Sequence, residues 1–246
     1  MAMDFFELKN ISEKFMEILN PISVEKILKV GEILGMKRGD RVIDFGCGYA
    51  EPLILWAEKF GISAIGIDIR EHAVQRATKK IFQKGLADRI QIAFGNAAAY
   101  QFEPHSFDFA TCIGSTFIWA GFTNSIDAMK RAVKPNGKLA IGDCYWNHDE
   151  FPSECNRFFQ DANHEHELLY EIWNKDCELI SLIRANIDDW DNYEISNWLG
   201  MIDWIENNPE HPDRDDVIRH LHDSQDEYLR YGRKYLGWGI FLLRIR

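Results

Sequence analysis

The sequence contains few cysteines, and none of them belongs to a paired motif. An odd, dispersed set without a Cys-x-x-Cys pair predicts neither a disulfide framework nor a zinc knuckle. We therefore expect free, mostly buried thiols. The five cysteines of the chain are Cys47, Cys112, Cys144, Cys155 and Cys177.

Long apolar runs and a secretory leader pattern are also missing. Charged residues or glycines interrupt each apolar run well before the length of a membrane-spanning helix. The first twenty residues include four acidic ones, Asp4, Glu7, Glu13 and Glu17, where a signal peptide would be basic and then apolar. The sequence therefore predicts a soluble, globular, cytoplasmic protein that does not act in a membrane.

Positive charge is in short supply. The chain has 28 Lys and Arg residues against 39 Asp and Glu residues, which gives a formal net charge of −11. A surface with this much negative charge repels the phosphate backbone of nucleic acids, which disfavours nucleic acid as a partner. We expect a small-molecule substrate instead.

A metal site is not expected either. The run His164-Glu165-His166-Glu167 invites a metal-binding interpretation, but histidines at i and i+2 point to different sides of a helix. No third ligand is spaced to join them. A solvated helix face is the favoured reading, and no metal is predicted.

The informative stretch is VIDFGCGYA, Val42–Ala50. An apolar strand leads into Asp44, and Gly46-Cys47-Gly48 breaks the run before a helix that opens at about Glu51. Glycines permit main-chain angles that a side chain would forbid, and they let a ligand approach a helix N-terminus. The third glycine of a dinucleotide fingerprint is missing, because Glu51 occupies its position. We predict a nucleotide-like cofactor over this turn, with the carboxylate of Asp44 facing it.

Strands and helices then alternate along the chain. Five such units predict a doubly wound α/β sheet that binds ligands at the carboxyl ends of its strands. After the strand that leads into Asp44, strands are expected at 63–67, 89–94, 107–113 and 138–142.

Polar residues stand at two of these strand ends. Asp68 follows the second strand, where an acidic side chain accepts the hydroxyl protons of a ribose; a helix N-cap is the compatible alternative. Asn96 follows the third strand, where it either hydrogen-bonds a base edge or forms an Asx turn.

These motifs, taken in order, resemble those of a known family over residues 38–146. The pieces are Asp44-x-Gly-x-Gly, the Gly-Ile-Asp that ends at Asp68, Gly-Asn-Ala at 95–97 and Val-Lys-Pro-Asn-Gly-Lys-Leu at 133–139. Together they resemble the class I S-adenosylmethionine-dependent methyltransferases. The Gly-Trp-Gly run at 237–239 and Trp190-Asp-x-Tyr-Glu further resemble a subset of small bacterial enzymes in that family.

The resemblance implies a fold. It is a doubly wound, mostly parallel, seven-stranded Rossmann-like sheet with a helical cap, and its antiparallel last strand lies between the fifth and sixth. The segments 177–184 and 237–243 are the expected sixth and seventh strands.

We expect one domain over 1–246, in four parts. N-terminal helices occupy 1–37, with the first over Phe5–Leu19, and the cofactor-binding core occupies 38–146. The sixth strand and helical lid insertions occupy 147–236, and the last strand lies in 237–246.

The resemblance also implies a cofactor, S-adenosylmethionine, with S-adenosylhomocysteine as product. The glycine turn would cradle the methionine moiety, Asp68 the ribose, and Asn96 with Ala97 the adenine, although the family more often has Asp where Asn96 stands. The expected cofactor-binding residues are Asp44, Gly46, Cys47, Gly48, Asp68, Ile69, Asn96, Ala97 and Ile113.

The predicted reaction is in-line methyl transfer to an oxygen, nitrogen or sulfur atom of a small metabolite. Candidate bases past the fifth strand are Asp143, Tyr145 and His148, each of which could equally be a turn or packing residue. Two other functions remain open: a cofactor-binding protein without transferase activity, and a nicotinamide-dependent oxidoreductase, which the missing glycine disfavours.

Tryptophan is abundant on the predicted pocket side. Indole faces stabilise sulfonium and ammonium groups, so an aromatic cage is one interpretation; packing between lid and sheet is the other. The tryptophans concerned are Trp119, Trp146, Trp190 and Trp198.

Overall fold

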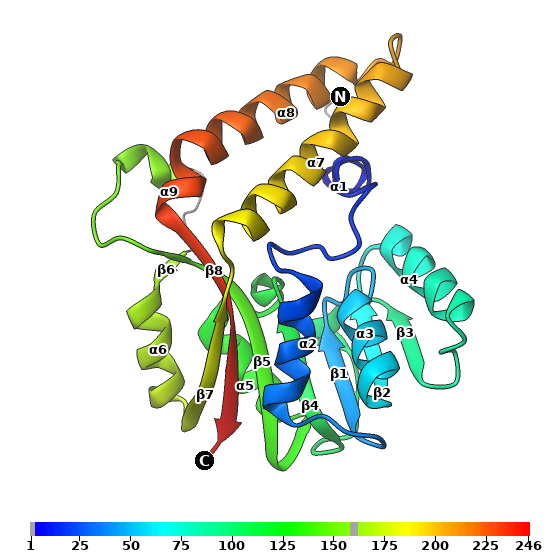
Figure 1. The fold of residues 1–246 in the computed structure, drawn as a ribbon, viewed down its shortest axis with the longest axis vertical. Coiled ribbons are helices and arrows are strands. Elements are labelled where there is room, and N and C mark those ends of the chain that lie inside the picture. Colours follow the sequence, from blue (N-terminus) through cyan, green and yellow to red (C-terminus); the bar gives the residue numbers. More distant parts are fainter. Residues whose placement is uncertain (1–2, 158–161) are drawn as a thin grey trace.

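The sheet is built outward from β1 (Arg41–Phe45), the strand that leads into the glycine turn. β1 pairs in parallel with β2 (Ser63–Asp68) on one side and with β4 (Phe107–Ile113) on the other. The computed structural model describes residues 3–157 and 162–246, and within these ranges the sheet has eight strands (Figure 1). Residues 1–2 and 158–161, inside the predicted 1–37 and 147–236 segments, lie outside the described part.

The strand order confirms the expected topology. It runs β3-β2-β1-β4-β5-β8-β7, and β8 is antiparallel to both of its neighbours, β5 and β7. A two-residue strand, β6, was not predicted; it pairs in parallel with the end of β5, and so short a segment has no readable periodicity. The remaining strands are β3 (Ile90–Phe94), β5 (Val133–Trp146), β6 (Asn163–His164), β7 (Cys177–Arg184) and β8 (Leu236–Ile245).

Helices cover both faces of the sheet because alternate strand residues are apolar on both sides. Val42 of β1 belongs to the cluster under α2 (Val24–Leu34), α3 (Glu51–Phe60) and α4 (Glu71–Gln83). Its neighbour Ile43 belongs to the cluster under α5 (Phe122–Lys130) and α6 (Glu165–Asn174). Burial on both faces is typical of parallel sheets.

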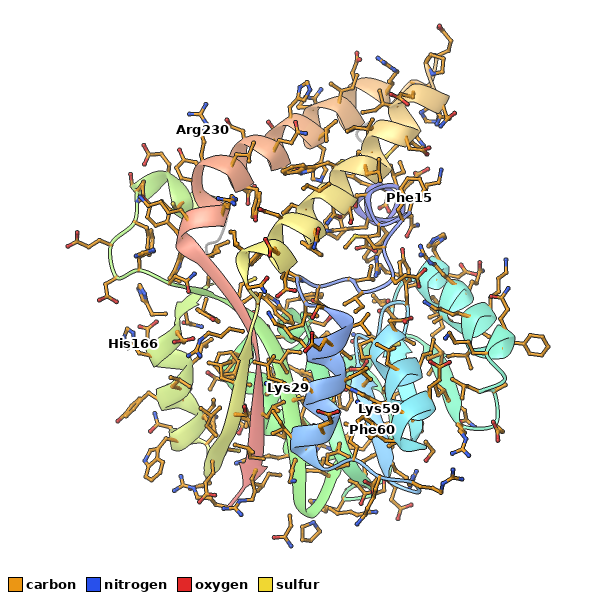
Figure 2. The ribbon with its side chains drawn as sticks, in the orientation of Figure 1. Phe15, Lys29, Lys59, Phe60, His166 and Arg230 are labelled. Carbon is orange, nitrogen blue, oxygen red and sulfur yellow. The ribbon has the colours of Figure 1, made fainter. Side chains whose placement is uncertain are left out.

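Local signals set the helix ends. The hydroxyl of Ser23 accepts a hydrogen bond from the backbone N–H of Lys26 at the start of α2. α2 ends at Gly35, with φ +76°, and α3 ends at Gly61, with φ +73°. Phe60 of α3 lies between α3 and α2 (Figure 2), where it closely contacts Gly31.

The first helix is much shorter than predicted. α1 spans Phe5–Ser12, whereas an unbroken helix was expected to residue 19. The guanidinium of Arg76 donates hydrogen bonds to the backbone carbonyls of Glu13, Lys14 and Met16, which a continuing helix would use internally. Residues 13–22 therefore form an irregular segment, here called the strap, that runs back toward α2 (Figure 1).

β5 is much longer than the predicted 138–142. It includes the Pro-Asn-Gly turn as an irregularity, because Val133 pairs with Phe107 while Lys138 already pairs with Phe109. At its other end β5 continues to Trp146, where β8 extends the pairing. Positions 143–146 are therefore strand residues.

A helical cap stands above the carboxyl edge of the sheet. α7 (Ile187–Asn207) and α8 (Arg214–Glu227) form a hairpin, and α1 lies beside α7 (Figure 1). A Cβ atom on Gly200 of α7 would lie 2.5 Å from the carbonyl oxygens of Ile11 and Ser12, so only glycine fits this contact. After α8 the chain makes a π-helical turn, Tyr228–Gly232, and the short α9, Arg233–Tyr235.

The remaining helical turns are short. In the described part of the chain, none of the helices combines the length and the apolar character needed to cross a membrane. The 3-10 segments are Ala97–Ala99, Thr116–Trp119 and Ser153–Arg157.

Candidate active site

A cavity of about 500 Å³ lies at the carboxyl ends of the central strands, under the strap and α1. Every residue predicted to bind the cofactor lines it. They come from the ends of β1, β2, β3 and β4, which a parallel sheet brings to one edge. The lining residues from the prediction are Asp44, Gly46, Cys47, Gly48, Asp68, Ile69, Asn96, Ala97 and Ile113.

The glycine turn is tightly packed. Gly46 and Gly48 have φ values of +78° and +54°, which disfavour other residues. A Cβ atom on Gly46 would lie 2.5 Å from Cβ of Ser115, and one on Gly48 would lie 2.8 Å from Cδ1 of Leu19. Both positions therefore require glycine, because of the backbone angles and because the neighbouring side chains leave no room for a Cβ atom.

The turn's own amides are already engaged. The N–H groups of Gly46 and Cys47 both donate to the carbonyl of Ile67, and the N–H of Gly48 donates to the carboxylate of Asp68 at 2.8 Å. These three N–H groups therefore already have partners within the protein. Side-chain groups provide much of the polar surface that is left.

Asp68 joins the first two strand ends. One carboxylate oxygen accepts from Gly48 and the other from the backbone N–H of Arg70, both at 2.8 Å. Each oxygen keeps lone-pair capacity for a further donor. The alternative as a helix cap does not hold, because the N-cap residue of α4 is Arg70.

Asn96 forms the Asx turn that was one of its two interpretations. Its side-chain oxygen accepts a hydrogen bond from the N–H of Ala98 at 2.9 Å. Within the described ranges no hydrogen bond involves the side-chain nitrogen of Asn96, so it can donate to a ligand in the cavity and the two roles coexist.

Asp44 is the buried acid of the site. The hydroxyl of Thr111 donates to it at 2.6 Å. Burial raises the pKa of Asp44 to about 7; the charge of Asp68 adds to this rise, and the Thr111 hydrogen bond opposes it. The carboxyl group therefore titrates near neutral pH.

The strap forms a wall of the cavity that the sequence did not reveal. The carboxylate of Glu13 pairs with Arg70 at 2.6 Å, and both side chains are largely buried. The side chain of Asn20 donates to the carbonyl of Ile113 at 3.1 Å. Tyr193 of α7 also lines the cavity. No local sequence pattern predicts these contacts, because they depend on how the cap folds over the sheet.

None of the predicted bases lines the cavity. The hydroxyl of Thr116 donates to Asp143 at 2.7 Å, and burial raises the pKa of Asp143. The side chain of Tyr145 is buried, with its ring centroid 6.2 Å from that of Phe241, and burial raises the pKa of Tyr145. β5 continues past the predicted strand end, so Asp143 and Tyr145 are strand residues and do not belong to a loop at the sheet edge. Tyr145 packs in the hydrophobic cluster under α5 and α6.

His148 packs edge-on against Tyr235, with ring centroids 5.6 Å apart. It likewise stands apart from the residues that line the cavity. The catalytic assignment of Asp143, Tyr145 and His148 stays a prediction.

The tryptophans divide between packing and a cavity. Trp119 contacts Phe45 edge-on at 5.0 Å, and Trp146 stacks on Phe151 at 4.0 Å. Trp190 lines a second, smaller cavity in the cap. His166, at the edge of the molecule in Figure 2, stacks on His164 away from both cavities.

A comparison with protein families decides the identity. The family described as "Methyltransferase domain" matches residues 36–207, well over half of the chain. The chain belongs to this methyltransferase family. The expectation of a class I S-adenosylmethionine-dependent methyltransferase is thereby confirmed, as is its Rossmann-like fold.

Similar structures span the whole methyltransferase. An S-adenosylmethionine-dependent methyltransferase of Geobacter sulfurreducens, in complex with S-adenosyl-L-homocysteine, is 31% identical with a TM-score of 0.92, covering 100% of this chain and 99% of that one. One from Thiobacillus denitrificans, in the same kind of complex, is 29% identical with a TM-score of 0.92, covering 100% of each chain.

YjhP of Escherichia coli strain K12 is 30% identical over 99% of this chain and 100% of its own length. Its X-ray structure gives a TM-score of 0.92. These proteins share the fold and the full length of the methyltransferase described here, cap included.

Proposed function

We propose that the protein binds S-adenosylmethionine in the 500 Å³ cavity and transfers its methyl group to an oxygen, nitrogen or sulfur atom of a small molecule. The observation that carries the proposal is the convergence of all the predicted cofactor residues on one cavity at the carboxyl edge of the sheet. Family membership and the S-adenosylhomocysteine complexes of two similar methyltransferases support it.

The polar groups of the cavity fit such a cofactor. The Asp68 carboxylate, held by two backbone N–H groups, has lone pairs left for the hydroxyls of a ribose. The Asn96 amide nitrogen, fixed by its Asx turn, can donate to an adenine ring nitrogen. Asp44, at the end of β1, offers a carboxyl group whose charge adjusts near neutral pH.

When bound, S-adenosylmethionine supplies a methyl carbon on a sulfonium, so that transfer leaves neutral S-adenosylhomocysteine and releases any proton carried by the acceptor atom. The chain's main tasks are then to orient the reactants and to exclude water. The strap serves the second task, because Glu13 and Asn20 fasten it to Arg70 and Ile113 across the cavity.

Tyr193 is a further candidate for orientation. It lines the cavity, and burial raises its pKa, so the phenol stays protonated and acts as a hydrogen-bond donor rather than as a base. If the acceptor needs a base, Asp143 and His148 stay the candidates, whereas burial raises the pKa of Tyr145 and disfavours it as a base for the reason given for Tyr193. We expect Asp143→Asn to leave the affinity for S-adenosylmethionine unchanged.

Calorimetric titration with S-adenosylmethionine tests the cofactor site. We expect Asp68→Ala to lose detectable binding and Asp88→Asn, at an exposed turn, to bind like the wild type. Thermal melting of both variants checks that the fold is intact. Unchanged affinity in a folded Asp68→Ala protein would contradict the assignment.

Label transfer tests the enzymatic step. Incubation with methyl-labelled cofactor and a metabolite extract should move the label into small molecules. Binding without any transfer would favour the alternative of a cofactor-binding protein that has no transferase activity.

A further inference from the structure

A second cavity, of about 160 Å³, lies inside the cap between α1, α7 and α8. It adjoins the cofactor cavity, because Lys9 of α1 and Tyr193 of α7 line both. Water occupies about 30 Å³ per molecule, so the space suits a ligand of roughly five non-hydrogen atoms. The methyl-transfer chemistry proposed above does not use this cavity.

Two carboxylates line the second cavity. Glu194 comes from α7 and Glu227 from the last turn of α8. Both are partly buried, and among residues 3–157 and 162–246 neither has a hydrogen bond or an ion-pair partner within 4 Å. Carboxylates held away from water without a partner are costly, so this cavity favours a cation.

Lys9 offsets these charges only in part. It is the cation of the cavity wall, and its charge lowers the pKa of Glu194, but it forms no ion pair with either carboxylate among the described residues. One lysine thus stands against two glutamates. His220 also lines the cavity, and burial lowers its pKa, which favours the neutral imidazole.

Aromatic rings complete the wall. The ring of Trp190 lies 6.2 Å from that of Tyr193 and 6.1 Å from that of Tyr228, measured between centroids, and all three residues line the cavity. Aromatic faces together with carboxylates form the combination that holds ammonium groups in proteins. Trp190 is one of the four tryptophans for which the sequence left an aromatic cage open, and these rings favour that interpretation inside the cap.

An unpartnered donor gives an independent sign of a ligand. Trp190 is 8% exposed, and its indole N–H has no hydrogen-bond partner within the part of the chain that the structure describes. Buried polar groups in folded proteins nearly always have a partner. This nitrogen is covered in the structure as it stands, so a hydroxyl or carbonyl oxygen of a bound ligand would supply the partner once the ring of Trp190 shifts toward the cavity.

We propose that the cap cavity binds the ammonium end of the methyl acceptor, a small amine that also carries a hydroxyl or carbonyl oxygen. This proposal rests on the proposed function, since it names the substrate class of the same methyltransferase. The ammonium nitrogen is the anchor and not the nucleophile, because a protonated amine has no lone pair. The acceptor atom is therefore a second heteroatom of the molecule, placed toward the cofactor cavity past Lys9 and Tyr193.

The test compares two probes of equal size, of which only one carries a positive charge. 3-Aminopropan-1-ol and propane-1,3-diol have the same number of non-hydrogen atoms, and the amine replaces one hydroxyl. We expect the wild-type protein, saturated with S-adenosylhomocysteine, to bind the amine at least tenfold more tightly, as measured by ligand-observed NMR titration. Equal binding of the two probes, or binding of neither, would overturn the proposal.

Variants locate the binding to this cavity. Glu194→Gln and Glu227→Gln should each weaken amine binding at least tenfold, whereas Glu206→Gln, exposed on the same helix α7, should leave it unchanged. Wild-type preference for the amine that persists in Glu194→Gln and Glu227→Gln would overturn the location. If either variant fails to fold, Trp190→Phe provides a second measure, since it should weaken binding of the amino alcohol and spare that of butylamine.

The same samples separate this proposal from the proposed function. If the wild-type protein does not bind S-adenosylmethionine, the proposed function itself is wrong. Cofactor binding without discrimination between amine and diol would remove only the acceptor assignment.

A pH titration adds a further readout. Burial raises the pKa of Glu194 and of Glu227 to about 7, Asp223 adding to the rise at Glu227. The other titratable groups around them are Lys9 from α1, Tyr193 from α7, His220 from α8 and Tyr228 from the π-helical turn. Amine affinity should therefore rise as pH increases through 7, and a flat profile would contradict the role of the two carboxylates.

Discussion

The carboxyl group of Asp44 and the hydroxyl of Thr111 are 2.6 Å apart at the floor of the cofactor cavity, where both side chains are buried. Neighbouring parallel strands, β1 and β4, place them in the same register. This pair shows how the site is made: one strand provides an acid, the next provides its hydrogen-bond donor, and the sheet excludes water from both.

Burial of Asp44 predicts a pH-dependent stability. Its pKa rises from 3.8 to about 7 on folding, so the protonated form favours the folded state. Stability from this group is present below pH 3.8 and is lost as pH rises through 7. Asp44→Asn mimics the protonated form, so its advantage over the wild type should grow between pH 4 and 7 to about 4 kcal/mol.

Urea unfolding at several pH values measures this advantage, with Asp88→Asn as an exposed control. An advantage that does not change with pH would show that Asp44 is ionised in the folded protein.

The buried ion pair between Glu13 and Arg70 predicts a large effect at the strap. Glu13→Gln leaves the buried guanidinium of Arg70 with only its more distant partner, the carboxylate of Asp68 at 3.7 Å, which should lower the free energy of unfolding by about 3 kcal/mol. Hydrogen exchange of the strap, residues 13–22, should accelerate in this variant, and the affinity for S-adenosylmethionine should fall.

Glu17→Gln is the matched control, because Glu17 is an exposed strap residue paired with Lys80. Its loss should cost less than about 1 kcal/mol. Equal effects of the two substitutions would mean that the strap is not fastened through Glu13.

The contact of Gly200 with α1 predicts that alanine is harmful at a helical position where it normally helps. In an ordinary helix Gly→Ala stabilises by about 1 kcal/mol. Here the new Cβ atom would lie 2.5 Å from two carbonyl oxygens of α1, so we expect Gly200→Ala to destabilise by about 1–3 kcal/mol. Thermal unfolding measures the change; Asn192→Ala, exposed on α7, should be neutral or stabilising.

Removing the positive charge of the cap cavity should strengthen amine binding. Lys9→Met eliminates the cation that partly offsets Glu194, so at pH 9, where the carboxyl groups are ionised, the amine probe should bind several-fold more tightly. Lys29→Met is the control, since Lys29 is exposed on α2, away from the cap (Figure 2). Weaker amine binding in Lys9→Met would show that Lys9 contacts the ligand as a donor instead.

The cofactor side of the site could be predicted because it depends on strand ends. In a parallel sheet, the residues that follow successive strands meet at one edge, so Asp44, Asp68 and Asn96 could be brought together from their positions alone. The glycines of the turn carry their own backbone requirement, which is also local.

The acceptor side could not be predicted, because its residues meet only through tertiary contacts. Lys9 and Tyr193 are far apart in the sequence, and the packing of α1 on Gly200 brings them together. The predicted bases failed to reach the cavity for a related reason. The length of β5 is set by pairing with β8, a strand distant in sequence, and no pattern around Asp143 reports that pairing.

The position of the cap between β7 and β8 has a mechanical consequence. These strands are antiparallel neighbours, and the paired residues Arg184 and Gly239 lie close to the two ends of the cap. Both ends are thus fixed at nearly the same point of the sheet, so the hairpin is joined covalently to the sheet at a single place. Because α1 packs against the middle of the hairpin at Gly200, a swing of the cap about this point would uncover the cofactor cavity, while the second cavity, enclosed by α1, α7 and α8, would move with the cap.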